Sequence, residues 1–238
     1  MSAQPPPPID REFSRRREHE LARHSLKKHP LGFSGQLGHW RDEQLARHAL
    51  KVAGDPGLVL ALPTGAGRFW PVLTEHTNRV VLAADPSLEM LAVAEASFPA
   101  EKLKRIKTFQ TSPLSIDLSA NAVDCIFCMR LFHHVADSDQ RSAILREFHR
   151  VTRDTVIVSL WVDGNIKAWR RKRLERGRAS AEPIASKMNR FVVSRAAIEA
   201  EFEQAGFQIL GHHDVLPGYA MWRDRKSTRL NSSHHPDL

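Results

Sequence analysis

Residues that could bind a nucleotide lie close together in the first half of the chain. Gly65 and Gly67 stand in a Pro-Thr-Gly-Ala-Gly turn, and Asp85 follows Gly65 by 20 positions. Because they have no Cβ, the two glycines let the chain turn tightly and let a ligand approach the backbone. A carboxylate at this distance can accept hydrogen bonds from both hydroxyls of a ribose. The spacing therefore predicts a site for an adenosine-containing ligand.

Apolar runs beside these residues predict the strands that would position them. Five apolar residues in succession, Leu58–Leu62, are typical of a parallel strand buried on both faces. Arg68–Glu75 is compatible with a helix, and Val80–Ala84 is a second apolar run, closed by Asp85. Strand, glycine turn, helix, strand and acidic residue make up the first half of a nucleotide-binding βαβ unit.

The residues after the glycine turn argue against a pyrophosphate-binding loop. A dinucleotide fingerprint requires a third glycine where this chain has Trp70. A Walker loop requires Gly-Lys-Ser/Thr after the turn, whereas Arg68 and Phe69 follow Gly67. A nucleoside cofactor without a pyrophosphate fits better, and S-adenosylmethionine is the obvious one.

Longer segments resemble a known family. LVLALPTGAGRF resembles motif I of the class I S-adenosylmethionine-dependent methyltransferases (type 11-like), and VVLAADPSLEML resembles their motif II. The similarity continues through Val123-Asp124, RLFHHV and REFHRVTRDTVIVSLW, and it covers roughly residues 40–223. This chain departs from motif I at two positions: Ala61 stands where the family usually has an acidic residue, and Pro63 where it usually has a glycine.

The resemblance implies a fold, a cofactor and a set of binding residues. The expected fold is α/β, a Rossmann-like class I methyltransferase sheet that is mostly parallel, with a truncated antiparallel final strand. The expected cofactor is S-adenosyl-L-methionine, and Asp85 would bind its ribose. The residues expected to line the cofactor site are Leu62, Pro63, Thr64, Gly65, Ala66, Gly67, Asp85, Pro86, Met90, Ser112, Pro113, Met129 and Leu131.

Two histidines follow the predicted fourth strand, Val123–Met129, at the end where open α/β sheets place their ligands. His133 and His134 could position a nucleophile or accept its proton. Alternatively, one histidine caps the next helix and the other packs against the cofactor. The catalytic assignment to His133 and His134 is therefore one of two interpretations.

The segment after the predicted fifth strand, Thr155–Trp161, carries the residues expected to contact the methyl acceptor: Trp161, Asp163, Lys167 and Arg170. Lys167–Arg178 has seven basic residues and one acidic residue. It could cover an anionic acceptor, or it could be an exposed helix whose charges keep it in water. The acceptor is expected to be a small molecule or a lipid headgroup.

Cysteine usage and hydropathy limit the class of protein. The chain has two cysteines and no apolar run close to 18 residues, so we expect a cytoplasmic protein without a transmembrane segment. Cys125 and Cys128 form a C-x-x-C pattern, but residues three apart on a strand point to opposite faces. The pattern therefore predicts two core residues and no metal site.

The net charge of +8 and the isoelectric point near 9.9 raise the question of nucleic-acid binding. Charge alone is weak support, and the Asn/Asp-Pro-Pro-Tyr/Phe tetrad of many nucleic-acid amino-methylating enzymes is missing after the fourth strand. An RNA methyltransferase and a noncatalytic S-adenosyl-binding module remain as alternatives to an enzyme acting on a small acceptor. Ala61 is the main support for the noncatalytic module.

Composition divides the chain into three parts. Residues 1–39 are proline-rich and then densely charged, which predicts a flexible basic arm. Residues 40–223 are the expected methyltransferase domain, with a substrate-covering insertion at 163–193. A packed helix is expected over Trp40–Val52, with Trp40, Leu45, Ala49 and Val52 near one face. A seventh strand is expected to begin at Tyr219–Arg223 and to pair antiparallel.

The C-terminal segment, residues 224–238, is interpreted as an artefactual tail. Residues 224–234, DRKSTRLNSSH, resemble the translation of a sequencing adapter. Such a segment has no evolved fold, so we expect residues 224–238 to be mobile and the shortened sheet to be less stable than its parent.

Overall fold

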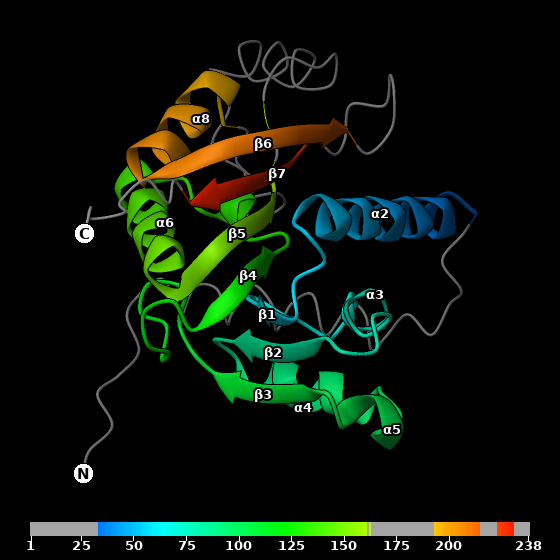
Figure 1. Cartoon of the computed structure of the whole chain (residues 1–238). Coiled ribbons are helices and arrows are strands. Elements are labelled where there is room, and N and C mark those ends of the chain that lie inside the picture. Colours follow the sequence, from blue (N-terminus) through cyan, green and yellow to red (C-terminus); the bar gives the residue numbers. More distant parts are fainter. Residues whose placement is uncertain (1–32, 161, 163–192, 215–222, 231–238) are drawn as a thin grey trace, which may run out of the picture.

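Seven strands form one sheet in a computed structural model that describes residues 33–160, 162, 193–214 and 223–230 (Figure 1). Their order is β3-β2-β1-β4-β5-β7-β6. The strands are β1 (Leu58–Ala61), β2 (Val80–Asp85), β3 (Ile106–Gln110), β4 (Val123–Cys128), β5 (Thr152–Ser159), β6 (Phe207–Asp214) and β7 (Arg223–Leu230). β1 to β5 pair in parallel, and β7 pairs antiparallel with both β5 and β6.

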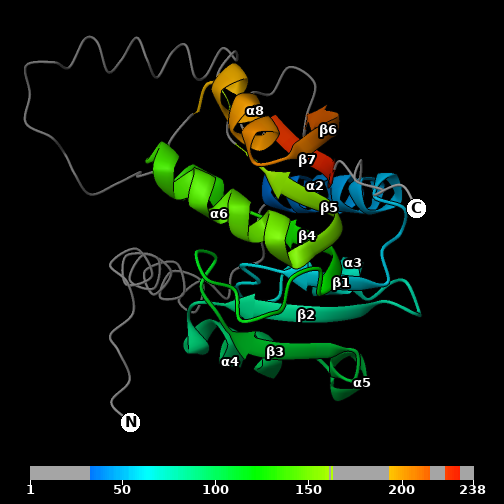
Figure 2. The same cartoon turned by 60° about the vertical axis from the view of Figure 1, so that its left-hand side comes forward.

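Helices cover both faces of the sheet. They are α2 (Phe33–Val52), α3 (Trp70–Leu73), α4 (Leu88–Ala96), α5 (Ala100–Leu103), the 3-10 helix η1 (Phe132–His134), α6 (Ser138–Val151) and α8 (Arg195–Gln204). α6 and α8 pack in one core with Leu60, Ile126 and Val156. α2, α3 and α4 contribute to the second core, with Val59 and Ile157. Figure 2 shows α6 beside α8, away from α4 and α5.

This double burial explains the sequence pattern, because strands covered on both faces are apolar throughout rather than alternating. The prediction of a mostly parallel, Rossmann-like α/β sheet is confirmed. α4 follows β2, and Ser87 caps this helix by accepting a hydrogen bond from the Met90 amide at 3.4 Å. None of the helices in the described ranges is long and apolar enough to cross a bilayer.

The N-terminal helix differs from the prediction at its start and on one face. α2 begins at Phe33, so the boundary of the flexible arm cannot lie at residue 39. Trp40 was expected to pack with Leu45 and Ala49, but 54% of its surface is exposed. The buried face is formed by Leu45, Ala46, Ala49 and Leu50, and Trp40 lies on the opposite side of the helix at 100° per residue.

The end of the chain differs as well. The last strand is Arg223–Leu230, so residues 224–230 are paired in the sheet although we expected a mobile tail. Ladder hydrogen bonds join backbone groups and depend little on side-chain identity, so an unrelated segment can complete the sheet between β5 and β6. Residues 215–222, which include Tyr219, and residues 231–238 lie outside the described ranges.

Candidate cofactor site

The glycine turn after β1 has a conformation that excludes side chains. Gly65 and Gly67 have φ angles of 58° and 73°, in the left-handed region that favours glycine. A Cβ on Gly67 would lie 3.0 Å from the side chains of Trp70 and Phe98. Trp70 also donates from its indole Nε1 to Oγ1 of Thr64 at 2.6 Å. The turn is therefore tightly packed on the side of Trp70, which stands where a dinucleotide site would need a third glycine.

Asp85 holds this turn against the end of β2. Its Oδ2 accepts a hydrogen bond from the Gly65 amide at 2.9 Å, and its Oδ1 accepts one from the Ser87 amide at 3.1 Å. The side chain is fully buried. A carboxylate oxygen can accept more than one hydrogen bond. The residues present therefore fit an adenosine-containing cofactor, although Asp85 also has a structural role that its spacing did not reveal.

The other expected cofactor residues lie on the same strand ends and loops, apart from Met90, which lies in the first turn of α4. Leu62 and Pro63 are buried directly after β1, Met90 is buried in α4, and Met129 and Leu131 are buried directly after β4. Thr64, Gly65 and Pro86 are half-buried and Ala66 is exposed. Because β1, β2 and β4 are parallel and adjacent, their carboxyl ends bring these residues to one edge of the sheet.

The loop that carries Ser112 and Pro113 is tied to α6. Glu147 accepts a hydrogen bond from the Ile116 amide at 2.9 Å. Arg150 donates to the carbonyl oxygens of Ile116 and Leu118 and pairs with Glu147 at 2.8 Å. The hydrogen bond from Arg150 is the main reason that the pKa of Glu147 is below its usual value. Sequence reasoning missed this pair, although a Glu and an Arg three residues apart on a helix are a recognisable signal.

His133 and His134 lie in η1 with their ring centroids 4.2 Å apart. His133 is 2% exposed. The following loop is fixed by Arg141, which donates to the carbonyl oxygens of Val135 and Ala136 at 3.1 and 2.7 Å. Two histidines are thus held at the carboxyl end of β4, but their part in catalysis remains a prediction. Trp161, Asp163, Lys167 and Arg170 lie outside the described residues.

The C-x-x-C prediction is confirmed in its geometry. Cys125 packs in the core formed with α2 and α3, whereas Cys128 packs in the core formed with α6 and α8. Burial raises the pKa of the Cys125 thiol to about 12, so it stays protonated at neutral pH. The two sulfurs lie on opposite faces of β4, as the strand period requires.

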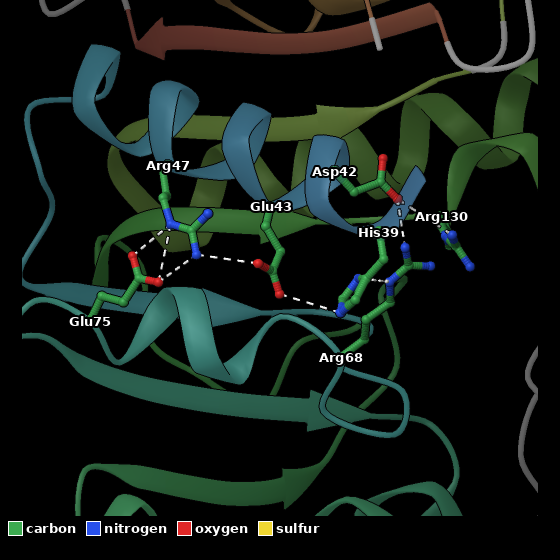
Figure 3. Close-up of polar contacts among 7 residues, drawn as sticks. All are labelled: His39, Asp42, Glu43, Arg47, Arg68, Glu75 and Arg130. Atoms are coloured by element: carbon green, nitrogen blue, oxygen red, sulfur yellow. Dashed lines mark hydrogen bonds and ion pairs between the residues drawn. The ribbon is translucent and has the colours of Figure 1, made fainter. Parts of the chain in front are cut away.

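A charged cluster at the same edge of the sheet was not anticipated. Asp42 of α2 pairs with Arg68, which directly follows the glycine turn, and with Arg130, which follows β4 (Figure 3). The only hint in the sequence is that Asp42 precedes Ala46 by one helical turn on an apolar face. Its partners could not be identified without the packing of α2 on the sheet.

Comparison with known proteins agrees with this geometry. Residues 59–155 match the family model of a methyltransferase domain. A methyltransferase-like protein of Schizosaccharomyces pombe, described as uncharacterized, is 27% identical over 92 residues, which are 39% of this chain and 34% of that protein. The chain thus aligns with about a third of that curated relative's length.

Solved structures share the fold at low sequence identity. Magnesium protoporphyrin IX methyltransferase from Synechocystis PCC 6803, with bound SAH, has a TM-score of 0.70 at 14% identity, covering 94% of this chain and 98% of its own. A "putative O-methyltransferase" from Nostoc punctiforme PCC 73102 has a TM-score of 0.60 at 21% identity, and the match covers 79% of this chain and 55% of that one. Residues 59–155 thus match a methyltransferase domain, and the chain shares the fold of these solved methyltransferase structures.

Proposed function

We propose that this chain binds S-adenosylmethionine and transfers its methyl group to an acceptor. The contact between Gly65 and Asp85 is the observation that carries the proposal. It joins the two segments that resemble motifs I and II, and both lie inside the matched methyltransferase domain. When bound, the cofactor supplies a methyl group that its sulfonium already activates. The chain's own residues then have to bind the cofactor and the acceptor, align them and keep water out of the site.

Each part of the site has a role in this proposal. Gly65 and Gly67 let the backbone approach the ribose and amino-acid portions of the cofactor. Asp85 accepts a hydrogen bond from the ribose of the cofactor. His133 and His134 accept a proton from a neutral acceptor, or line the cofactor if the acceptor is an amine or thiolate that needs no base.

The acceptor in this proposal is a small molecule or a lipid headgroup with an anionic group. The support is the basic segment Lys167–Arg178, which follows β5 in the chain. Trp161, Asp163, Lys167 and Arg170 are the proposed acceptor contacts, and residues 163–193 are the proposed cover. A cytoplasmic location belongs to the proposal too, and its support is that Cys125 and Cys128 are not joined in a disulfide.

Binding of S-adenosylhomocysteine by isothermal titration calorimetry tests the cofactor. The wild-type chain is expected to bind, and Asp85→Asn should weaken binding at least about tenfold, because the amide cannot accept at both positions. Asp117→Asn, which alters an exposed carboxylate in the loop after β3, is the control and should bind like the wild type. Absence of binding by the wild-type chain would refute the proposal.

Turnover is tested separately. The chain is incubated with methyl-labelled cofactor and a fractionated cell extract, and label is expected in a small-molecule or lipid fraction. Label in RNA, with binding that weakens steeply as salt rises, would favour the RNA methyltransferase instead. Binding of the cofactor without label in any fraction would favour the noncatalytic module.

A further inference from the structure

Two arginines flank the point where the strand order reverses. The order β3-β2-β1-β4-β5 changes direction between β1 and β4, and open α/β sheets bind ligands outside the carboxyl ends of the strands at this position. Arg68 lies in the loop that leaves β1, one residue after Gly67. Arg130 lies in the loop that leaves β4. Both cations are therefore at the place where the fold puts a ligand.

A single carboxylate oxygen holds the two guanidinium groups. Oδ2 of Asp42 lies 2.8 Å from Nη2 of Arg68 and 3.6 Å from Nη2 of Arg130 (Figure 3). The Asp42 side chain is 8% exposed, whereas those of Arg68 and Arg130 are 32% and 36% exposed. Asp42 lies on the buried face of α2, where charged residues are rare unless they are paired. The carboxylate is thus the buried anchor, and the arginines are its accessible partners.

Arg68 keeps a donor that could bind a second carboxylate. Its Nε donates to His39 and its Nη2 donates to Asp42. Within the described part of the chain its Nη1 makes no hydrogen bond, and a guanidinium pairs readily with carboxylates. Arg68 is therefore suited to bind a carboxylate other than that of Asp42.

The backbone conformation of Arg130 also supports a role in ligand binding. Its φ angle is 61°, in the left-handed region that non-glycine residues rarely adopt, and its amide donates to Oγ of Ser159 at 2.7 Å. Such conformations are costly, and they cluster at ligand-binding sites, where the surrounding structure holds them in place. An arginine at a position that suits glycine indicates that its side chain is needed.

We propose that Arg68 and Arg130 bind the carboxylate of the cofactor's amino-acid portion, and that Asp42 is the positioning residue that holds them together. This inference rests on the proposed function, because it names the residues that would hold one end of the proposed cofactor. It makes α2 part of the cofactor site. Asp42 of α2 supplies a carboxylate beside the glycine turn, whereas motif I itself has Ala61 in place of the usual acidic residue.

Two ligands separate this role from a structural one. S-Adenosylhomocysteine and 5′-methylthioadenosine share the adenosine and the thioether sulfur, and only the first has the amino-acid portion. In calorimetric titrations, Arg68→Met and Asp42→Ala should each weaken S-adenosylhomocysteine binding about tenfold or more, the loss of one charge-assisted hydrogen bond. Neither variant should change the affinity for 5′-methylthioadenosine. Arg47→Met, which removes the same charge from the ion pairs of Arg47 with Glu43 and Glu75, should leave both affinities unchanged.

The variant Arg130→Gly is expected to change the affinity for the ligand without lowering the thermal stability. Glycine adopts a φ of 61° without strain, so the thermal midpoint should be unchanged or higher, while the affinity for S-adenosylhomocysteine alone falls. If a variant weakens the binding of both ligands equally, or leaves the affinity for both unchanged, the carboxylate assignment is refuted. A gain in S-adenosylhomocysteine affinity on Asp42→Ala would refute the positioning role. If the wild-type chain binds neither ligand, the proposed function itself fails.

Discussion

Gly67 makes the turn of the cofactor site dependent on a missing side chain. Its left-handed φ of 73° and its 3.0 Å distance from Trp70 and Phe98 leave no room for a Cβ. Gly67→Ala should therefore lower the free energy of unfolding by at least about 1–2 kcal/mol, the cost of a left-handed non-glycine residue. Urea unfolding followed by circular dichroism measures this change.

A second glycine provides the matched comparison. Gly38 lies within α2, and a Cβ placed on it would meet no atom within 4 Å. Gly38→Ala should raise the free energy of unfolding by about 0.5–1 kcal/mol, because alanine restricts the unfolded chain more and favours the helix. Equal effects of the two substitutions would show that the turn is not constrained as described.

At the scale of elements, a buried ion pair joins α6 to α8. Arg141 donates to Glu201 at 2.6 Å, and both side chains are less than a tenth exposed. Arg141→Met leaves the Glu201 charge buried and should cost about 3–5 kcal/mol in the free energy of unfolding. The double variant Arg141→Met, Glu201→Leu should recover part of that loss, because no uncompensated charge remains. Chemical denaturation of the wild type, both single variants and the double variant gives the coupling directly.

The pair of Glu147 and Arg150 predicts a dependence on pH. The pKa of Glu147 is lowered, mainly by the hydrogen bond from Arg150, so its contribution to stability is complete above the ordinary carboxyl pKa of 4.5. That contribution is lost as the pH falls through the lower value of the folded state. Glu147→Gln should therefore lower the thermal midpoint at neutral pH and flatten its decline in acid.

Thermal melts from about pH 7 down to about pH 3 compare the wild type with Glu147→Gln over the range in which the Glu147 carboxylate becomes protonated. Glu101→Gln is the control, because the Glu101 side chain is 82% exposed in its pair with Lys104 and should contribute little. A decline in acid that is as steep for Glu147→Gln as for the wild type would show that Glu147 does not supply it.

At the scale of the whole molecule, β7 joins β6 to the rest of the sheet. It pairs with β5 on one side and with β6 on the other. Deleting residues 224–238 removes both ladders and should lower the thermal midpoint by at least about 4 °C, which for a chain of this size corresponds to about 1–2 kcal/mol. Replacing residues 224–230 with an unrelated strand-forming sequence should restore most of this loss, since the pairing is made by the backbone. A deletion without effect would show that β7 contributes no stability.

Much of the architecture could be predicted from local patterns. The apolar runs at Leu58–Leu62 and Val80–Ala84 indicated strands buried on both faces, and the sheet places them side by side. The alternation of Cys125 and Cys128 between two cores also followed from the strand period. The environment of Trp40 was predicted wrongly, because a single aromatic residue does not show which face of a helix meets the sheet.

The sequence by itself determined the βαβ unit, the glycine turn and the acidic residue that closes it. These features depend on short-range periodicity and on the conformational freedom of single residues, which a linear chain displays directly. Only the tertiary structure decided that Asp85 accepts a hydrogen bond from the Gly65 amide. It also decided that Asp42 of α2 pairs with Arg68 and Arg130, in the loops after β1 and β4 where the strand order reverses. Those contacts join residues far apart in the chain, and they exist because burying two cores brings α2 and the loops after β1 and β4 to the same edge of the sheet.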